Sequence, residues 1–357
     1  MSKAAELANL IGNINAGGGG VNRNLLINGS MAVAQRGTSH TTASAYTLDR
    51  WTISETTDGA VTITQDSSVP TGSGLANSYK LDVTTADTSL SSAQRVFPHQ
   101  IIEAQNCQVL QYGTSEAKPI TLSFYVKSNV TGTYTVLFYN SDASKHQSAT
   151  YTIDSANTWE QKKITIQGDT ASGFNDDNGA GLEISWWLAA GSSYTSGTLG
   201  TGLWQSETAA NKVSSSNVNI MSSTDNEWFL TGCQVEVGQN PTSFEHEPFD
   251  TTLEKCFRYF QKVPSGVGAT YIYDDIVMHY SSNVYGSMQL IKKMRGTPTV
   301  TITTNGGYYE AGAGHSITNT NSRNPDAMCI NYYGTVNGGS SGGAGSIYLA
   351  YTTDAEL

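Results

Sequence analysis

Residues 230–238 read Leu-Thr-Gly-Cys-Gln-Val-Glu-Val-Gly, and residues 241–246 continue as Pro-Thr-Ser-Phe-Glu-His. Apolar and polar residues alternate through the first stretch, which predicts a β-strand with one face toward a core. Gly238 and Pro241 close this strand. The more apolar set, which we expect to face inward, is Thr231, Cys233, Val235 and Val237.

A short polar helix is expected directly after this strand, over residues 252–262. A strand that finishes one β-domain and a helical connector that opens the next place a domain boundary near Phe249. The sequence therefore predicts four parts: an N-terminal docking helix with a Gly tether at 1–21, a lectin-like jelly-roll β-sandwich at 22–249, a helical connector at 250–262 and a C-terminal β-domain at 263–357.

The composition favours strands and turns over long helices. Of the 357 residues only 14% are charged, while 36 are Gly and 19 are Tyr. Candidate strands, among them Asn24–Asn28, Tyr46–Ser54 and Leu182–Ala189, follow one another with one helical interruption at Gln100–Leu110. This density predicts an all-β fold: a jelly-roll-like antiparallel β-sandwich followed by a smaller C-terminal β-domain, with a short N-terminal helix.

Charge and hydropathy narrow the classes of partner. The net charge of −11 argues against a nucleic-acid partner, because such proteins need basic patches that displace counterions. There is no run of about 18 apolar residues, so we expect no membrane insertion. The N-terminus lacks the apolar core of a secretory signal, so we expect synthesis in the cytoplasm. The four dispersed cysteines are expected to be buried free thiols: Cys107, Cys233, Cys256 and Cys329.

Catalytic motifs are weak in this chain. The pattern G-x-S-x-G at Gly338–Gly342 lies inside a Gly/Ser-rich run, without the strand and helix that a nucleophile elbow needs. Asp274 and Asp275 are glycosidase candidates by residue type, but strand neighbours point to opposite faces. Residues 176–179, Asp-Asp-Asn-Gly, are too short for a complete calcium loop and favour an acidic turn. We expect a non-enzymatic protein with no cofactor and no metal.

Four separated patches resemble the lectin-like β-sandwich of phage tail-fibre proteins. The signature of that family is L-x-G-x-Q-x-E-x-G, then T-x-F-E, then L-x-x-C-x-R-Y-Y. It begins here at Leu230 and ends at Phe260, which replaces the second Tyr. Residues 24–51 resemble the opening of that sandwich and residues 100–128 its centre, so the likeness covers roughly 22 to 262.

The family resembles carbohydrate-binding modules in fold, and the likeness has functional implications. The resemblance implies a phage virion protein: a short tail fibre that forms a homotrimer and acts in host-surface polysaccharide recognition and attachment. The start of the chain is similar to structural proteins from marine phages. The alternatives are a capsid-attached fibre or decoration protein and a small capsule depolymerase, although no repeat of fixed period supports the latter.

The N-terminus offers a candidate virion-docking element. Residues 2–14 predict a short helix that Ser2 can cap, followed by a tether at Gly17–Gly20. One apolar stripe runs along it: Ala4, Leu7, Ile11 and Ile14. A helix this short is marginal alone in water, so we expect it to dock on another virion protein or to form the top of a trimeric bundle. A frayed terminus is the alternative.

Sugar binding needs aromatic faces beside hydrogen-bonding groups, and two regions offer them. In the sandwich the candidates are Trp187, Tyr194 and Trp204, with inward plugs from a long loop as the alternative. In the C-terminal domain the candidates, expected in loops, are Tyr308, Tyr309, Tyr332 and Tyr333. Tyr271 and Tyr273 offer a further pair, and packing at a trimer interface is the alternative for these sets. If the N-terminus docks on the particle, the C-terminal set lies at the distal end and is favoured for recognition.

Overall fold

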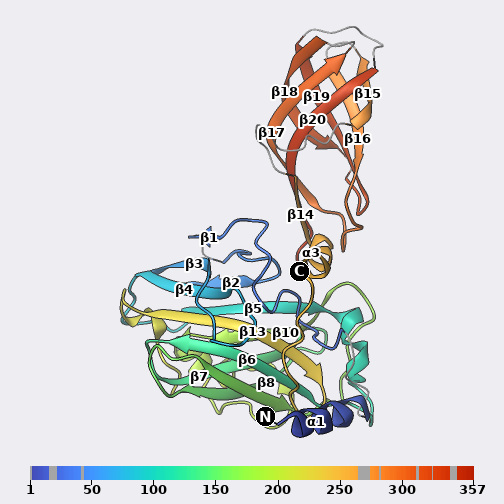
Figure 1. Ribbon diagram of the computed structural model, residues 1–357. Helices are drawn as coiled ribbons and strands as arrows, with labels where there is room; N and C mark the ends of the chain where they lie inside the picture. The colour runs from blue at the N-terminus through green and yellow to red at the C-terminus, as the bar shows by residue number, and fades with distance from the viewer. Residues whose placement is uncertain are drawn as a thin grey trace. The chain divides into compact units, whose positions relative to one another are not determined.

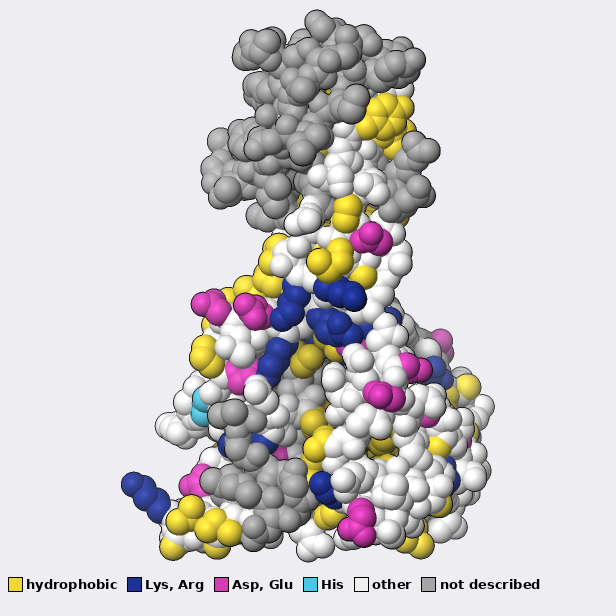
Figure 2. All heavy atoms as spheres, turned by 90° about the vertical axis from the view of Figure 1, so that its right-hand side faces the viewer, with side chains coloured by type: hydrophobic (Ala, Val, Ile, Leu, Met, Phe, Trp, Pro, Cys, Tyr) yellow, Lys and Arg dark blue, Asp and Glu magenta, His cyan; other side chains and the backbone are white. Residues whose placement is uncertain are grey.

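The computed structural model of the protein describes residues 2–15, 22–41, 44–263, 274–280, 283–310, 313–323, 325–337 and 344–357 (Figure 1). The chain divides into two compact units, Met1–Phe249 with Leu357 and Asp250–Glu356. On the face that Figure 2 shows, most described side chains are uncharged and the acidic ones are dispersed.

The first unit is an all-β sandwich of two antiparallel sheets, the fold class that the sequence predicts. The first sheet has the order β1 (Ser39–His40), β3 (Ala60–Asp66), β4 (Ser78–Thr85), β13 (Glu227–Val237), β6 (Ile120–Ser128) and β9 (Glu160–Ile166). The second has the order β11 (Ala189–Ala190), β5 (Arg95–Glu103), β10 (Ala180–Trp187), β7 (Gly132–Asn140), β8 (Lys145–Ile153) and β12 (Gln205–Ser206), with β2 (Thr52–Glu55) beside β5. The helical pieces are α1 (Lys3–Asn15), α2 (Ser192–Thr195) and the 3-10 turns η1 (Ala104–Leu110), η2 (Ala209–Asn211) and η3 (Ile220–Ser222).

Large aromatic side chains fill the space between the two sheets. Trp186 on β10 lies 5.5 Å from Trp51 and 5.8 Å from Phe124, measured between ring centroids, and all three are fully buried. Burial of one such side chain is worth about 1.5–3 kcal/mol. Because side chains alternate along a strand, Trp187 lies on the opposite, outer face of the second sheet.

A β-bulge changes which residues of β13 face the core. Gly232 has φ +61°, and the register with β6 shifts between Thr231 and Gln234. The extra residue reverses the alternation, so Leu230 belongs to the core, whereas Thr231 donates its hydroxyl hydrogen to the Asn77 carbonyl at 2.6 Å. The prediction was therefore wrong for Thr231 and Leu230. Beyond the bulge the core-facing residues are the expected Cys233, Val235 and Val237.

The strand expected at Asn24–Asn28 is absent from the strands of the described chain. Side-chain amide oxygens accept hydrogen bonds from its backbone N–H groups instead: Leu26 N donates to Asn24 Oδ1 at 3.1 Å, and Ile27 N donates to Gln100 Oε1 at 2.8 Å. The expected strand Tyr46–Ser54 is limited to Thr52–Glu55, and the helical patch begins only at Ala104, after β5 ends.

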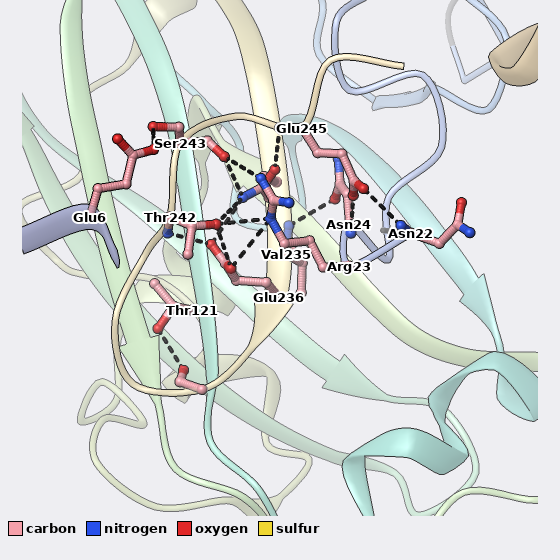
Figure 3. Close-up of polar contacts among 12 residues, drawn as sticks. Glu6, Asn22, Arg23, Asn24, Thr121, Val235, Glu236, Thr242, Ser243 and Glu245 are labelled. Carbon is pink, nitrogen blue, oxygen red and sulfur yellow. Dashed lines mark hydrogen bonds and ion pairs between the residues drawn. The ribbon is translucent and has the colours of Figure 1, made fainter. Parts of the chain in front are cut away.

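The polar residues of the signature close the sandwich (Figure 3). Glu236 is fully buried, and its carboxylate accepts hydrogen bonds from Thr242 N at 2.7 Å, Thr242 Oγ1 at 2.8 Å and Gln234 Nε2 at 2.9 Å. The Nε atom of Arg23 lies 3.9 Å from Glu236 Oε2. The loop after β13 is thereby fastened to the end of that strand and to the start of the sandwich.

Glu245 makes a second connection between the ends of the sandwich. Its carboxylate accepts from the backbone N–H groups of Asn22 at 2.7 Å and Asn24 at 3.0 Å (Figure 3). The signature positions Gln234, Glu236, Thr242 and Glu245 thus belong to one closing network.

Helix α1 is capped as expected, since Ala5 N donates to Ser2 Oγ at 3.3 Å. Glu6 accepts a hydrogen bond from the hydroxyl of Ser243 (Figure 3). Three members of the apolar stripe are exposed: Ala4, Leu7 (57%) and Ile11 (50%). The side chain of Ile14 lies outside the described part of the chain. Much of the stripe is therefore uncovered in a single chain.

The second unit is a small antiparallel sheet that follows one helix. Its elements are α3 (Phe249–Phe257), β14 (Phe260–Val263), β15 (Asp274–Tyr280), β16 (Asn283–Gln289), β17 (Thr299–Glu310), β18 (Ala313–Arg323), β19 (Cys329–Asn337) and β20 (Ala344–Asp354). The strand order is β14-β20-β15-β16-β19-β18-β17, and β20 also pairs with β17, so the sheet closes on itself. The connector helix ends at Phe257, earlier than predicted, because Phe260 already pairs with Asp354.

Candidate functional site

A cleft of about 370 Å³ lies on the outer face of the second sheet of the sandwich. Its lining comes from β5, β7 and β10, and from the covering segment, which we define as residues 190–214 and which holds α2, β12 and η2. Ligand pockets in proteins occupy about 300–1,000 Å³, so this cleft has the size of a small-molecule site.

Strand register sets the floor of the cleft. Glu183 on β10 pairs with Tyr139 on β7, and both side chains lie on the face opposite the core. Four positions further along β10, and on the same face, Trp187 packs in a small apolar cluster with Phe97 and Leu137. The floor is therefore apolar at one end and polar at the other.

Tyr194 of α2 forms one wall. Its ring centroid lies 5.1 Å from that of Trp187, and its hydroxyl accepts a hydrogen bond from Arg95. Arg95 Nε also donates to Ser54 Oγ at 3.2 Å. The backbone N–H of Val213 donates to the Tyr194 carbonyl at 3.1 Å, which joins the two ends of the covering segment.

Lys212 and Glu207 form the facing wall. The ammonium of Lys212 lies 2.5 Å from Glu207 Oε1 and 5.4 Å from the ring centroid of Tyr139. The Tyr139 hydroxyl donates to Glu207 Oε2 at 3.1 Å. The hydrogen bond from Lys212 lowers the pKa of Glu207 below its usual value, so this carboxylate stays ionised near neutral pH.

Glu183 is the exception among the charged groups of the cleft. It is half-buried, and within the described part of the chain its carboxylate has neither a hydrogen bond nor an ion pair. Burial raises the pKa of Glu183 to about 7, a shift that the nearby Lys212 opposes. The cleft therefore presents half-exposed aromatic rings and an acceptor group with unused capacity.

The structure brings together two of the three sandwich residues that the sequence singles out. Trp187 is only 2% exposed, because it stacks on Phe97 at 4.3 Å and the covering segment lies over it. It supports the cleft floor beneath Tyr194. Trp204 lies elsewhere: its indole N–H donates to the Gln167 carbonyl at 2.8 Å and its ring packs against Tyr112. Trp204 thus matches the alternative interpretation, an inward plug from a long loop.

The loop location predicted for the four C-terminal tyrosines was wrong, since Tyr308 and Tyr309 lie on β17 and the other two on β19. Tyr332 is 1% exposed within the core of the second unit and does not present its ring to a ligand. Tyr333 is half-buried and stacks on Tyr285 at 6.4 Å.

Four aromatic candidates have side chains outside the described residues. The side chains of Tyr308 and Tyr309 lie outside the described part of the chain, as do the whole residues Tyr271 and Tyr273. Recognition by Tyr308 and Tyr309 stays a prediction.

Sequence reasoning missed Glu183, Arg95, Glu207 and Lys212. One signal was available for Glu183: residues 182–187 read Leu-Glu-Ile-Ser-Trp-Trp, and strict alternation puts Glu183 on the same face as Trp187. The other three reach the cleft through tertiary contacts that no local pattern encodes.

No group of three His, Cys, Asp or Glu side chains among the described residues is placed to share a metal ion. None of the helices found there has the length and apolarity to cross a membrane.

No protein-family model matches the chain, and no curated protein matches it. Several solved structures are similar to part of the chain. The enzymatically active domain of tailspike protein 4 of bacteriophage CBA120 is 16% identical with a TM-score of 0.34, and the match covers 60% of this chain and 21% of that one. The chain thus spans only about a fifth of the tailspike structure.

Carbohydrate-binding modules are also similar to part of the chain. A family 11 module from Clostridium thermocellum is 12% identical with a TM-score of 0.28, covering 58% of this chain and 98% of that one. A xylan-binding domain from Paenibacillus barcinonensis is 13% identical with a TM-score of 0.28, covering 53% and 91%.

Proposed function

We propose that the protein binds a glycan in the cleft of its sandwich. The observation that carries this proposal is the pairing of half-exposed rings, Tyr139 and Tyr194, with the unpartnered carboxylate of Glu183. Sugar rings offer C–H faces that pack on aromatic side chains and hydroxyls that donate to carboxylates. A mostly preformed apolar site with a few convergent polar groups is the usual form of a small-ligand site.

The finer proposal is a phage virion protein, a short tail fibre that attaches to host-surface polysaccharide. It is supported by the likeness of residues 230–260 to tail-fibre sandwiches and by the exposed stripe of α1, which suits docking on another virion protein or in a homotrimer. The same sequence likeness and exposed stripe also fit the alternative, a capsid-attached fibre or decoration protein. Labelling the protein on intact particles and imaging them distinguishes tail from capsid.

The glycan proposal is tested with two variants of Tyr139. A glycan array identifies ligands, and titration followed by tryptophan fluorescence measures affinity, because Trp187 lies in the cleft floor. Tyr139→Ala removes the ring and should weaken binding by about fivefold, as expected for the loss of ~1 kcal/mol of stacking.

Tyr139→Phe is the matched control. Both variants remove the hydroxyl that contacts Glu207, but Phe keeps the ring, so its affinity should stay near that of the wild type. Wild-type affinity in both variants would move the binding site away from this cleft.

A glycoside hydrolase, the small depolymerase, is a second candidate because Glu183 and Glu207 line one cleft with pKa values shifted in opposite directions. Glycosidases pair a protonated acid with an ionised carboxylate in this manner. Binding is favoured here, since both oxygens of Glu207 already accept hydrogen bonds. New reducing ends after incubation with host polysaccharide, absent with Glu183→Gln, would establish the hydrolase instead.

A further inference from the structure

Three of the four charged groups that line the cleft already have hydrogen-bond partners. Glu207 is shared by Lys212 and the Tyr139 hydroxyl. Arg95 donates to the Tyr194 hydroxyl and to Ser54 Oγ. Lys212 therefore already has an anionic partner, whereas two neutral hydroxyls hold Arg95 in place.

Glu183 behaves differently because its carboxylate is half-buried and, within the described residues, unpartnered. A ligand hydroxyl placed beside it supplies the missing donor. A ligand carboxylate or sulfate placed there would instead bring two anions together in a partly desolvated site, where their repulsion is stronger than in water.

We infer that the cleft takes uncharged sugar residues and that Glu183 discriminates against residues bearing a carboxylate or a sulfate. This inference rests on the proposed glycan-binding function and adds the chemical class of the ligand. It also makes Glu183 a specificity-determining residue, distinct from the rings that supply stacking.

The pH dependence of this discrimination provides a readout that a structural role would not produce. The titratable and charged groups around Glu183 are Arg95 and His99 on β5, Tyr139 on β7, His146 on β8, and Glu207 and Lys212 on the covering segment. Burial lowers the pKa of His99 to about 4 and also lowers that of His146, while it raises the pKa of Tyr139. His99, His146 and Tyr139 therefore stay neutral, and Glu207 stays ionised, between about pH 6.5 and pH 8.5.

Glu183 is the group that titrates in that interval, since its pKa is about 7. The protonated carboxyl group does not repel an anion, and it accepts a hydrogen bond from a sugar hydroxyl less strongly than the ionised carboxylate does. Discrimination against anionic sugars should therefore be weak at about pH 6.5 and strong at about pH 8.5.

The test uses the full chain. A glycan array with neutral, uronic acid, sialylated and sulfated members is followed by titration of the best neutral oligosaccharide and of its C6-oxidised, hexuronate counterpart. The wild type should prefer the neutral ligand by about tenfold or more at about pH 8.5, and less at about pH 6.5. Glu183→Gln should bind both ligands with similar affinity at either pH, and its melting curve should show that the sandwich is folded.

Equal wild-type affinity for both ligands at the higher pH, or an unchanged preference in Glu183→Gln, overturns the inference. If the wild type binds both ligands equally and Tyr139→Ala still weakens that binding, the selectivity is overturned but the glycan site stays in place. Loss of the proposed function has a different signature, because neither ligand then responds to Tyr139→Ala.

Discussion

Replacing Glu236 with Gln should destabilise the sandwich more than any change of an exposed carboxylate. Glu236 is fully buried and accepts three hydrogen bonds from Gln234 and Thr242, with Arg23 3.9 Å away. A Gln amide keeps the shape but presents an NH₂ group to one or more of these donors. Hydrogen bonds to a charged group contribute about 1.5–3 kcal/mol each, and breaking a buried charge arrangement costs about 3–5 kcal/mol.

The lower end of that range is expected, because the Arg23 side chain is 17% exposed and keeps part of its hydration. A loss of about 3 kcal/mol lowers Tm by roughly 6–12 °C in a domain of this size. Thermal unfolding is followed by tryptophan fluorescence, which reports on the sandwich because all six tryptophans lie between Trp51 and Trp228.

Glu227→Gln is the matched control on the same strand. Glu227 is 34% exposed in its side chain and forms a surface ion pair with Lys80 at 2.7 Å, so its loss should cost at most about 1 kcal/mol. A Glu236→Gln variant no less stable than Glu227→Gln would refute the assignment of the closing network as a main support of the sandwich.

Three further predictions concern assembly and attachment. Sedimentation of the full chain should give a trimer, because the stripe of α1 is uncovered in one chain, and a stable monomer at micromolar concentration would contradict this. Deletion of residues 1–16 should leave the tryptophan melting curve unchanged yet abolish incorporation into virions; normal incorporation would place the anchor elsewhere. Changing Tyr308 and Tyr309 to Ala should leave adsorption to host cells unchanged, because the proposed glycan site lies in the sandwich cleft; weaker adsorption without unfolding would place recognition in the second unit.

The fold class could be predicted from the sequence because alternation and turn residues are local signals. The register of β13 could not, because Gly232 forms a bulge that reverses the facing of the residues before it. Pattern analysis assumes unbroken alternation and therefore placed Leu230 on the wrong face. The strand predicted at Asn24–Asn28 was wrong for a related reason. Side-chain amides accept the hydrogen bonds that a neighbouring strand would otherwise accept.

The candidate site was only partly accessible from the sequence. Trp187 and Tyr194 were found as aromatic residues, but their contact depends on how the covering segment folds over the second sheet. Glu207 and Lys212 lie on that segment, far in sequence from Tyr139, and meet it only in the folded chain. Tyr332 shows the opposite error, since its ring belongs to the core of the second unit.

The most direct test of the central claim is a crystal structure of the full chain soaked with the best neutral oligosaccharide from the array. The account predicts a sugar ring in the sandwich cleft, packed on Tyr139 or Tyr194, with a hydroxyl within hydrogen-bond distance of the Glu183 carboxylate. Sugar bound to the second unit, with this cleft empty at saturating ligand, would contradict it.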